Sequence, residues 1–205
     1  MDEKFKEILE GAMTIFMRIG IRSVSIDDIA HELKIAKKTI YQYFKNKEEI
    51  VMAMLNLVIE KEEQSFHKLK EMTSNNAIDM LLGVSQEVSN NFKEVKPSHV
   101  FDLRKYYPRQ FEDFWKIKRE LVLKRIKDNL NQGVKENLFR NDMNIDLVAD
   151  LYTRRLEEFH MVEDELYTKY SFDDIFKTMF ENHIRGISNE NGIKYFELKK
   201  KELNY

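Results

Sequence analysis

Hydrophobic residues recur at helical spacing along most of this chain. Close to the N-terminus the apolar positions lie three or four residues apart, which predicts an amphipathic helix with one buried face. These positions are Ile8, Leu9, Ala12, Met13, Ile15, Phe16 and Ile19. Gly20 follows directly and is expected to end the helix, because glycine adopts the left-handed conformation that closes helices. Ser25 then precedes a second short apolar stripe and is predicted to cap its helix.

A third short helix is predicted to begin at Lys37, after a turn at residues 34–36. On a helical wheel one arc of this helix is polar and exposed. This arc carries Lys37, Lys38, Tyr41 and Gln42. Ile40 and Phe44 lie on the other side, where they can anchor the helix to the first one. Two short helices that are joined by a tight turn and braced by a longer helix form a helix-turn-helix.

The rest of the chain continues the helical pattern. The predicted helices cover residues 47 to about 69, 77 to about 92, 108 to about 138, 145–160 and 172–187, and the charged segment from Ile193 adds a last helix. Pro97 and Pro108 can each begin a helix at its first turn. Because no alternating strand pattern is present, we predict an all-α fold. A helix-turn-helix domain over residues 1–47 would precede a larger helical domain over residues 48–205.

Composition narrows the class of protein. Hydrophobic residues make up 42% of the 205 positions, which is enough to build a core, and two prolines with six glycines leave long stretches that favour helices. The absence of cysteine excludes disulfides and thiolate metal sites. No apolar run reaches the length of about 20 residues that spans a bilayer, and the acidic N-terminus differs from a secretion signal. We therefore expect a cytoplasmic protein that does not interact with membranes.

Charge is distributed unevenly. The segment from Lys34 to Lys47 contains five lysines and no acid, although acids outnumber Lys plus Arg by 36 to 34 in the whole chain. Acids would repel a phosphate backbone, whereas lysine, tyrosine and glutamine can bond to phosphates and base edges. This pattern indicates binding to double-stranded DNA. The alternatives are a solvated lysine-rich face and ordinary core packing of the aromatic residues in YQYF.

The segment SIDDIAHELKIAKKTIYQYFKNKEEI closely resembles the DNA-binding segment of TetR/AcrR-type bacterial transcriptional regulators. That segment typically reads T-x-x-D-I-A-x-x-x-G-V-S-x-x-T-L-Y-x-Y-F-x-x-K-E-x-L, and most of its fixed positions match here in order. Lys34 departs from a common glycine in the turn, Ala36 from the usual serine cap, and Lys38 from a frequent glycine. Loss of the capping hydroxyl is expected to cost about 1 kcal/mol, and Lys38 changes what can be read from DNA.

The resemblance implies specific roles in DNA binding. Ser25, Thr39, Tyr41, Tyr43 and Lys47 would hold phosphates, and Lys37, Lys38 and Gln42 would face base edges. Lysine and glutamine suit guanine and adenine edges, while hydroxyl groups suit the backbone. Tyr43 lies nearer the core side of the wheel, so a structural role stays open for it. A symmetric homodimer would bind an operator made of inverted half-sites.

In the resembling family the larger domain binds a small molecule and dimerises through its last two long helices, which correspond here to residues 145–160 and 172–187. The resemblance thus implies a repressor that a small effector releases from its operator. Aromatic and methionine side chains would suit an apolar ligand. The candidates are Met80, Phe101, Tyr107, Phe111, Trp115 and Phe159. Each can instead belong to the core, and both helical stripes can pack within one chain.

Enzyme activity, metal binding and cofactors are not expected. The five histidines form no H-E-x-x-H zinc spacing, and no Gly-rich phosphate loop or G-x-S-x-G elbow is present. Glu157 and His160 have the spacing of half a di-iron site, but such a site needs a second pair, so we interpret them as a surface coincidence. The alternative function is a helical interaction protein whose helix-turn-helix no longer reads DNA. Retention of Thr39, Tyr41 and Lys47 favours DNA binding.

Overall fold

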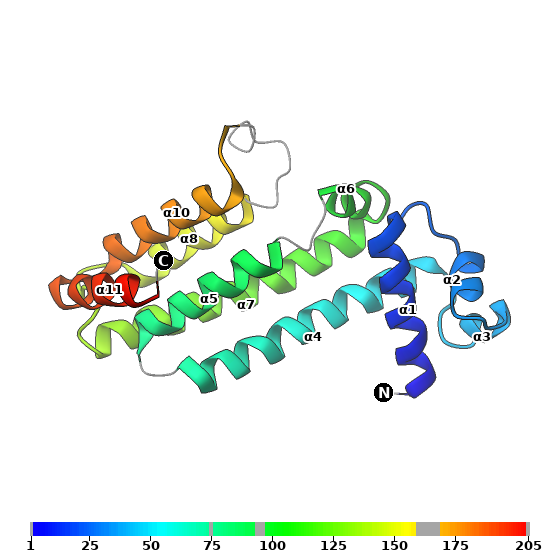
Figure 1. The fold of residues 1–205 in the computed structure, drawn as a ribbon, viewed down its shortest axis with the longest axis horizontal. Helices are drawn as coiled ribbons and strands as arrows, with labels where there is room; N and C mark the ends of the chain where they lie inside the picture. Colours follow the sequence, from blue (N-terminus) through cyan, green and yellow to red (C-terminus); the bar gives the residue numbers. More distant parts are fainter. Residues whose placement is uncertain (1, 74–75, 93–96, 159–168, 204–205) are drawn as a thin grey trace. The chain divides into compact units, whose positions relative to one another are not determined.

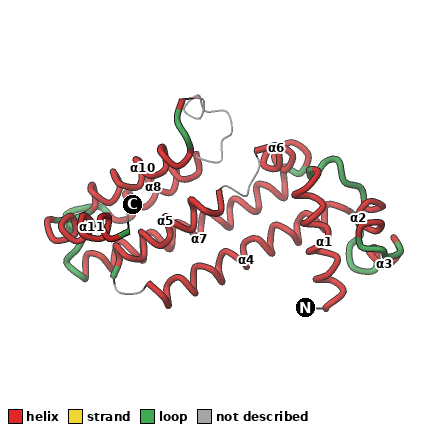
Figure 2. The backbone as a smooth tube through the Cα atoms, viewed as in Figure 1, coloured by secondary structure: helices red, strands yellow, loops and turns green. Residues whose placement is uncertain are grey.

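The computed structural model describes residues 2–73, 76–92, 97–158 and 169–203. Every regular element in these ranges is an α-helix (Figure 1; Figure 2), which confirms the all-α prediction. The helices are α1 (Glu3–Ile19), α2 (Ile26–Glu32), α3 (Lys37–Tyr41), α4 (Lys47–Thr73), α5 (Ala77–Phe92), α6 (Pro97–Tyr106), α7 (Pro108–Lys135), α8 (Ile145–Glu158), α10 (Phe172–Ile187) and α11 (Glu190–Glu202). Across the described ranges, none of these helices has the length and hydropathy needed to cross a membrane.

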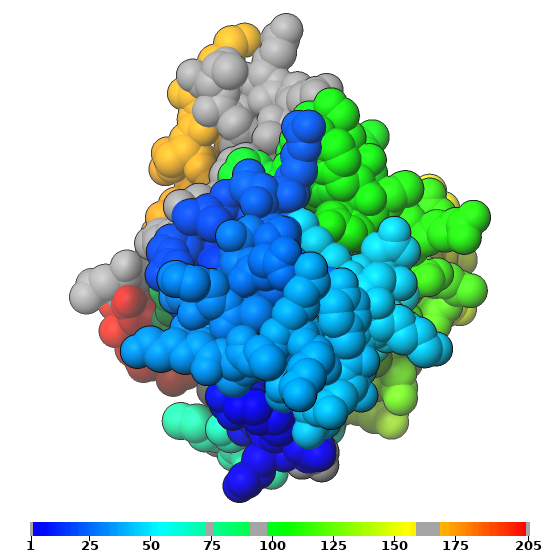
Figure 3. Space-filling model, turned by 90° about the vertical axis from the view of Figure 1, so that its right-hand side faces the viewer, coloured from blue at the N-terminus to red at the C-terminus, as the bar shows by residue number. Residues whose placement is uncertain are grey.

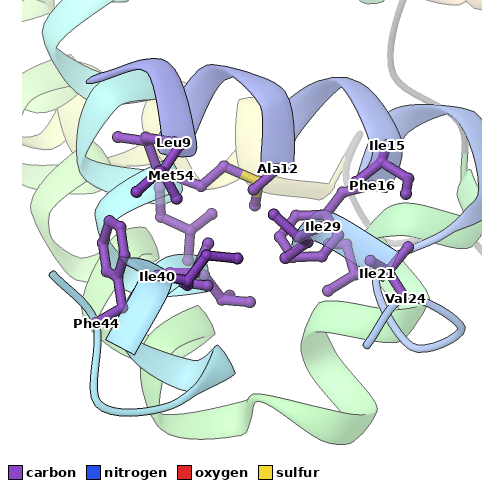
Figure 4. Close-up of a cluster of buried hydrophobic side chains, with 14 of the residues drawn as sticks. Leu9, Ala12, Ile15, Phe16, Ile21, Val24, Ile29, Ile40, Phe44 and Met54 are labelled. Atoms are coloured by element: carbon purple, nitrogen blue, oxygen red, sulfur yellow. The ribbon is translucent and has the colours of Figure 1, made fainter. Parts of the chain in front are cut away.

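The first of two compact units contains Met1–Gln64 and Val95–Lys118. Its core is apolar and combines Phe16 of α1, Ile29 of α2 and Ile40 of α3, whose side chains converge in Figure 4. Leu103 of α6 and Tyr107, which follows α6, are buried in the same cluster. The unit is therefore larger than the three helices predicted to read DNA, because α4, α6 and α7 also supply residues to it.

The second unit contains Ser65–Glu94 and Arg119–Tyr205. Its core draws on α5, α7, α8, α10 and α11, with Leu130, Phe180 and Phe196 almost fully buried. The connector after α7 pairs with the end of α10 through an isolated bridge between Phe139 and Ser188. Gly133 permits this packing, since a Cβ there would lie 2.0 Å from the Phe139 ring.

Two helix ends show how local backbone geometry decides where a helix begins or ends. Helix α7 ends at Lys135 instead of about residue 138, because Asn137 takes a left-handed conformation (φ 55°) and the chain turns there. Helix α11 begins at Glu190, before the predicted start at Ile193. Its earlier start follows from Asn189, whose side-chain oxygen accepts the Gly192 N–H at 3.0 Å.

Candidate DNA-binding surface

Helices α1, α2 and α3 form the predicted helix-turn-helix head. Gly20 closes α1 with φ 93°, a conformation that favours glycine. Ser25 caps α2 as predicted, since its hydroxyl oxygen accepts the Asp28 N–H at 3.1 Å and the Asp28 carboxylate accepts the Ser25 N–H at 2.7 Å. This reciprocal pair is a capping box. Hydrogen bonds from Ser25 hold the pKa of the Asp28 carboxyl below its ordinary value.

The turn between α2 and α3 carries two of the three departures from the family motif. Lys34 adopts φ 54°, the left-handed conformation for which the motif supplies glycine. Ala36 precedes α3, and its side chain makes no capping hydrogen bond. Helix α3 has five residues and is fixed to the core by Ile40, which is fully buried. Phe44 beyond it packs on Phe5 of α1 with ring centroids 4.8 Å apart.

The polar arc predicted for α3 is on the surface. Lys38, Tyr41 and Gln42 are exposed, and the Tyr41 side chain retains 47% of its accessible area. Figure 3 looks onto the surface to which the blue helices of the head and the cyan start of α4 contribute. Lys38 forms no ion pair with any residue in the described part of the chain. These three side chains can approach the base edges or phosphates of a duplex.

Lys37 is exposed but already has an anionic partner. Its ammonium group lies 2.8 Å from the Asp27 carboxylate, a contact that raises the pKa of Lys37 above its ordinary value. Both side chains are about half exposed, so the pair contributes little to stability. To bond to a base edge, the Lys37 ammonium group would have to share or leave Asp27.

Lys47 occupies a partly enclosed position at the start of α4. Its ammonium group donates to the Arg22 carbonyl at 3.2 Å and lies 5.7 Å from the Phe16 ring centroid. Burial lowers the pKa of Lys47, while the charges of Asp102 and Asp28 partly oppose this change. Lys47 therefore links the α1–α2 connection to α4 in addition to any contact with phosphate.

The hydroxyl residues differ in their surroundings. The Tyr43 hydroxyl donates to Asp2 at 3.4 Å and its ring meets Phe5 edge-on at 6.5 Å, so Tyr43 has a structural role in the head. Thr39 is partly exposed on α3. The Ser25 hydroxyl is engaged by Asp28 on both sides, as acceptor and as donor, so a phosphate contact would add to its capping role.

Arg22 and Asp102 are contacts of the head that sequence reasoning did not identify. The Asp102 carboxylate on α6 accepts the Arg22 N–H at 3.1 Å, and the Arg22 guanidinium lies 4.5 Å from the Tyr106 ring centroid. These residues fix the connection that precedes Ser25. No sequence pattern points to the pairing, because 80 positions separate the two partners.

The six candidate ligand residues belong to two units, except for one that lies outside the described residues. Tyr107 lies in the core of the first unit. Phe111 packs against that core, and its ring meets the Trp115 ring edge-on with centroids 5.8 Å apart. Phe101 is 51% exposed on α6. Met80 is buried on α5 in the second unit. Phe159 lies outside the described residues, so the pocket stays a prediction.

The Glu157–His160 pair falls partly outside the described residues, which include Glu157 but not His160. The Glu157 carboxylate forms an ion pair with the Arg119 guanidinium on α7. Among the residues that the structure describes, no group of three or more His, Asp or Glu side chains is arranged to hold a metal ion. The described geometry of Glu157 is thus that of an ion pair.

Comparison with known proteins shows that the head is similar to one described family. Residues 8–54 match the family described as bacterial regulatory proteins, tetR family. The HTH-type transcriptional repressor KstR2 of Mycobacterium tuberculosis is 28% identical over 152 residues, which are 69% of this chain and 72% of the repressor. An uncharacterized HTH-type transcriptional regulator of Bacillus subtilis, YuxN, is 43% identical over 61 residues, 30% of this chain, and the match spans only 21% of YuxN.

Solved structures extend the likeness to the whole fold. The structure of KstR2, described as a ketosteroid transcriptional regulator, matches with a TM-score of 0.57 and 24% identity over 93% of this chain and 97% of that one. Reduced NemR of Escherichia coli matches with a TM-score of 0.71 and 14% identity over 91% and 98% of the two chains. At these identities the structures support the shared fold.

Proposed function

We propose that this chain is a repressor of the tetR family of bacterial regulatory proteins, to which its head is similar, and that its α2 and α3 bind operator DNA. In the proposal two heads of a symmetric homodimer enter successive major grooves, so the operator consists of inverted half-sites. The proposed dimer forms through α8 and α10. The relatives named above are transcriptional regulators, and KstR2 carries the name of a repressor.

The observation that carries this proposal is the division of α3 into two faces. Ile40 is fully buried and holds the helix on the core, whereas Lys38, Tyr41 and Gln42 project from it. No acid lies between Lys34 and Lys47, so the exposed charge is positive. In the proposal Lys38 and Gln42 read base edges, and Thr39 and Tyr41 hold phosphates.

Fluorescence anisotropy tests the proposal with duplexes from the DNA upstream of the gene and with shuffled duplexes of equal composition. We expect salt-dependent binding to both and a preference for one upstream sequence. Lys38→Ala and Gln42→Ala should reduce discrimination at particular base pairs by about 5- to 150-fold, the range for one bidentate contact. Lys45→Ala is the matched control, because Lys45 is an exposed lysine just beyond α3. Its ammonium group lies 3.9 Å from the Glu49 carboxylate, so its charge already has a partner.

The alternative is a helical protein whose helix-turn-helix no longer reads DNA. It predicts no salt-dependent binding of the wild-type protein to any duplex. A uniform loss of affinity in Lys38→Ala, equal for all sequences, would leave DNA binding intact but contradict the assignment of Lys38 as a base reader.

A small apolar molecule is the proposed effector, and it would bind in the larger helical domain and release the head from DNA. The similarity to KstR2, described as a ketosteroid regulator, makes polycyclic apolar compounds the first class to test. Aromatic and methionine side chains within one unit would suit such a ligand, because these side chains favour apolar compounds. Release requires a ligand that prefers the form of the protein that does not bind DNA.

A further inference from the structure

We infer that Lys34, in the turn between α2 and α3, is a further DNA-binding residue whose ammonium group binds a phosphate of the duplex. The inference rests on the proposed DNA binding of the head. It adds a residue to which neither the helical wheel nor the family motif gives a role, because the motif commonly has glycine at this position.

The backbone of Lys34 is held in an unfavourable conformation. With φ 54°, Lys34 takes a conformation in which the Cβ of an L-residue crowds the following carbonyl oxygen. Among the described residues, the other non-glycine residue with positive φ is Asn137, a type that tolerates this region. Lysine has no such tolerance, so Lys34 is the exception.

Two hydrogen bonds enforce the conformation. The Lys34 N–H donates to the His31 carbonyl at 3.1 Å, and the Ile35 N–H donates to the Ala30 carbonyl at 3.0 Å. These are the two bonds of a Schellman motif, in which glycine normally occupies the position of Lys34. Ile35, the residue after Lys34, packs against the core and fixes the chain at that point. The Lys34 side chain therefore leaves the backbone at a fixed point, three residues before α3.

The positive charge of Lys34 is not neutralised within the head. Lys34 is exposed and forms no ion pair in the described part of the chain. The acids of α2 have other partners, which are Lys37 for Asp27, Ser25 for Asp28 and Arg18 for Glu32. An exposed lysine that lies beside a DNA-reading helix and has no carboxylate partner attracts phosphate.

Strain and charge together distinguish this lysine from an ordinary surface residue. Glycine would relieve the backbone strain without loss of a core contact, yet the position holds a residue with a long cationic side chain. Strained residues concentrate at functional sites, where the surrounding structure holds them in place. A phosphate contact gives the lysine side chain a function at a position where glycine would be less strained.

Three substitutions separate strain from charge. Lys34→Gly removes both, Lys34→Gln removes the charge and keeps the strain, and Lys34→Arg keeps both. Lys45→Gln is the matched control for loss of an exposed lysine close to α3. The measurements are thermal unfolding without DNA, and anisotropy titrations over a range of salt concentrations with an upstream duplex and with a duplex of unrelated sequence.

We expect Lys34→Gly to raise the midpoint of thermal unfolding by about 2–4 °C, because the strain is relieved. The same variant and Lys34→Gln should bind both duplexes about 25- to 100-fold more weakly at 0.1 M salt, because each of the two heads of the proposed homodimer loses one phosphate contact. They should also flatten the slope of log affinity against log salt by about 1.8, which is about 0.9 for each lost contact. Lys34→Arg and Lys45→Gln should bind as the wild type does.

Wild-type affinity and slope in both Lys34→Gly and Lys34→Gln would overturn the inference while leaving DNA binding of the head in place. An equal loss in Lys45→Gln would overturn it too, because the effect would then be one of net charge. A loss confined to the upstream duplex would mean a base contact instead of a phosphate contact. If the wild type binds neither duplex, the proposed function fails and the inference fails with it.

Discussion

His183 of α10 is a titratable residue that folding encloses. Its ring stacks on Tyr152 of α8 with centroids 3.5 Å apart and an interplanar angle of 5°. Burial lowers the pKa of His183 from 6.5 to about 4, because the charged imidazolium loses its hydration. The folded protein therefore holds this histidine neutral at physiological pH.

The low pKa of His183 predicts acid-sensitive stability. The unfolded chain binds a proton at this site below about pH 6.5, whereas the folded chain does so only near pH 4, so protonation favours unfolding as the pH falls between these values. We expect His183 to reduce the free energy of unfolding by about 2–3 kcal/mol across this window. His183→Phe should keep the ring stack and remove this part of the loss. Urea unfolding at several pH values measures the free energy of unfolding and its change with pH.

The control for this titration is His31→Gln. His31 is exposed on α2, so folding does not enclose its side chain as it does that of His183. If His183→Phe lost stability below pH 6.5 as steeply as the wild type, the acid sensitivity would belong to other groups. Carboxylates such as Glu181, whose pKa hydrogen bonds from Lys200 and Arg185 lower, lose their stabilising contribution at more acidic pH.

At the scale of elements, α8 and α10 carry faces that the described residues do not cover. Leu147 and Leu151 are 54% and 60% exposed and lie one turn apart on α8. On α10, Gly186 faces open space, since no atom lies within 4 Å of the Cβ that a substitution would add. Apolar side chains and an accessible helix backbone suit the dimer proposed for these helices.

The double substitution Leu147→Glu with Leu151→Glu tests that dimer. We expect the wild type to sediment with the mass of two chains and the variant with the mass of one, because four buried carboxylates would oppose association. Loss of the second head should weaken operator binding by about a hundredfold or more. Leu198→Glu is the matched control, since Leu198 is 61% exposed on α11, outside the proposed interface. If the double variant still sediments with the mass of two chains, another face of the protein forms the dimer.

At the scale of the whole molecule, the proposed release from DNA by an effector means that ligand binding and operator binding change each other's affinity. A ligand that changes operator affinity must itself be bound with an affinity that the operator changes by the same factor. A coupling of about 1–3 kcal/mol corresponds to a change of about 5- to 150-fold. Calorimetric titration of a polycyclic apolar ligand into the protein, with and without operator DNA, measures this factor. Equal ligand affinities in the two titrations would leave a DNA-binding dimer without this response.

The sequence by itself determined the helices and the nature of the head. Apolar residues at a spacing of three or four identify one buried face wherever a helix forms, and Ser25, Gly20 and Ile40 have the predicted capping, terminating and anchoring roles. The polar arc of α3 was also predictable, since neighbours on one helix are fixed by its geometry. Each of these features depends on residues a few positions apart.

Only the tertiary structure decided which charges and cores are shared between distant segments. It pairs Lys37 with Asp27 and brings Tyr107 into the core of the first unit. It also partly encloses Lys47, whose ammonium group donates to the Arg22 carbonyl. Such contacts depend on where the chain returns after many residues, which periodicity along one helix does not encode. Chemical type alone made Met80 and Tyr107 candidates for a ligand pocket, whereas the structure assigns them to two different units.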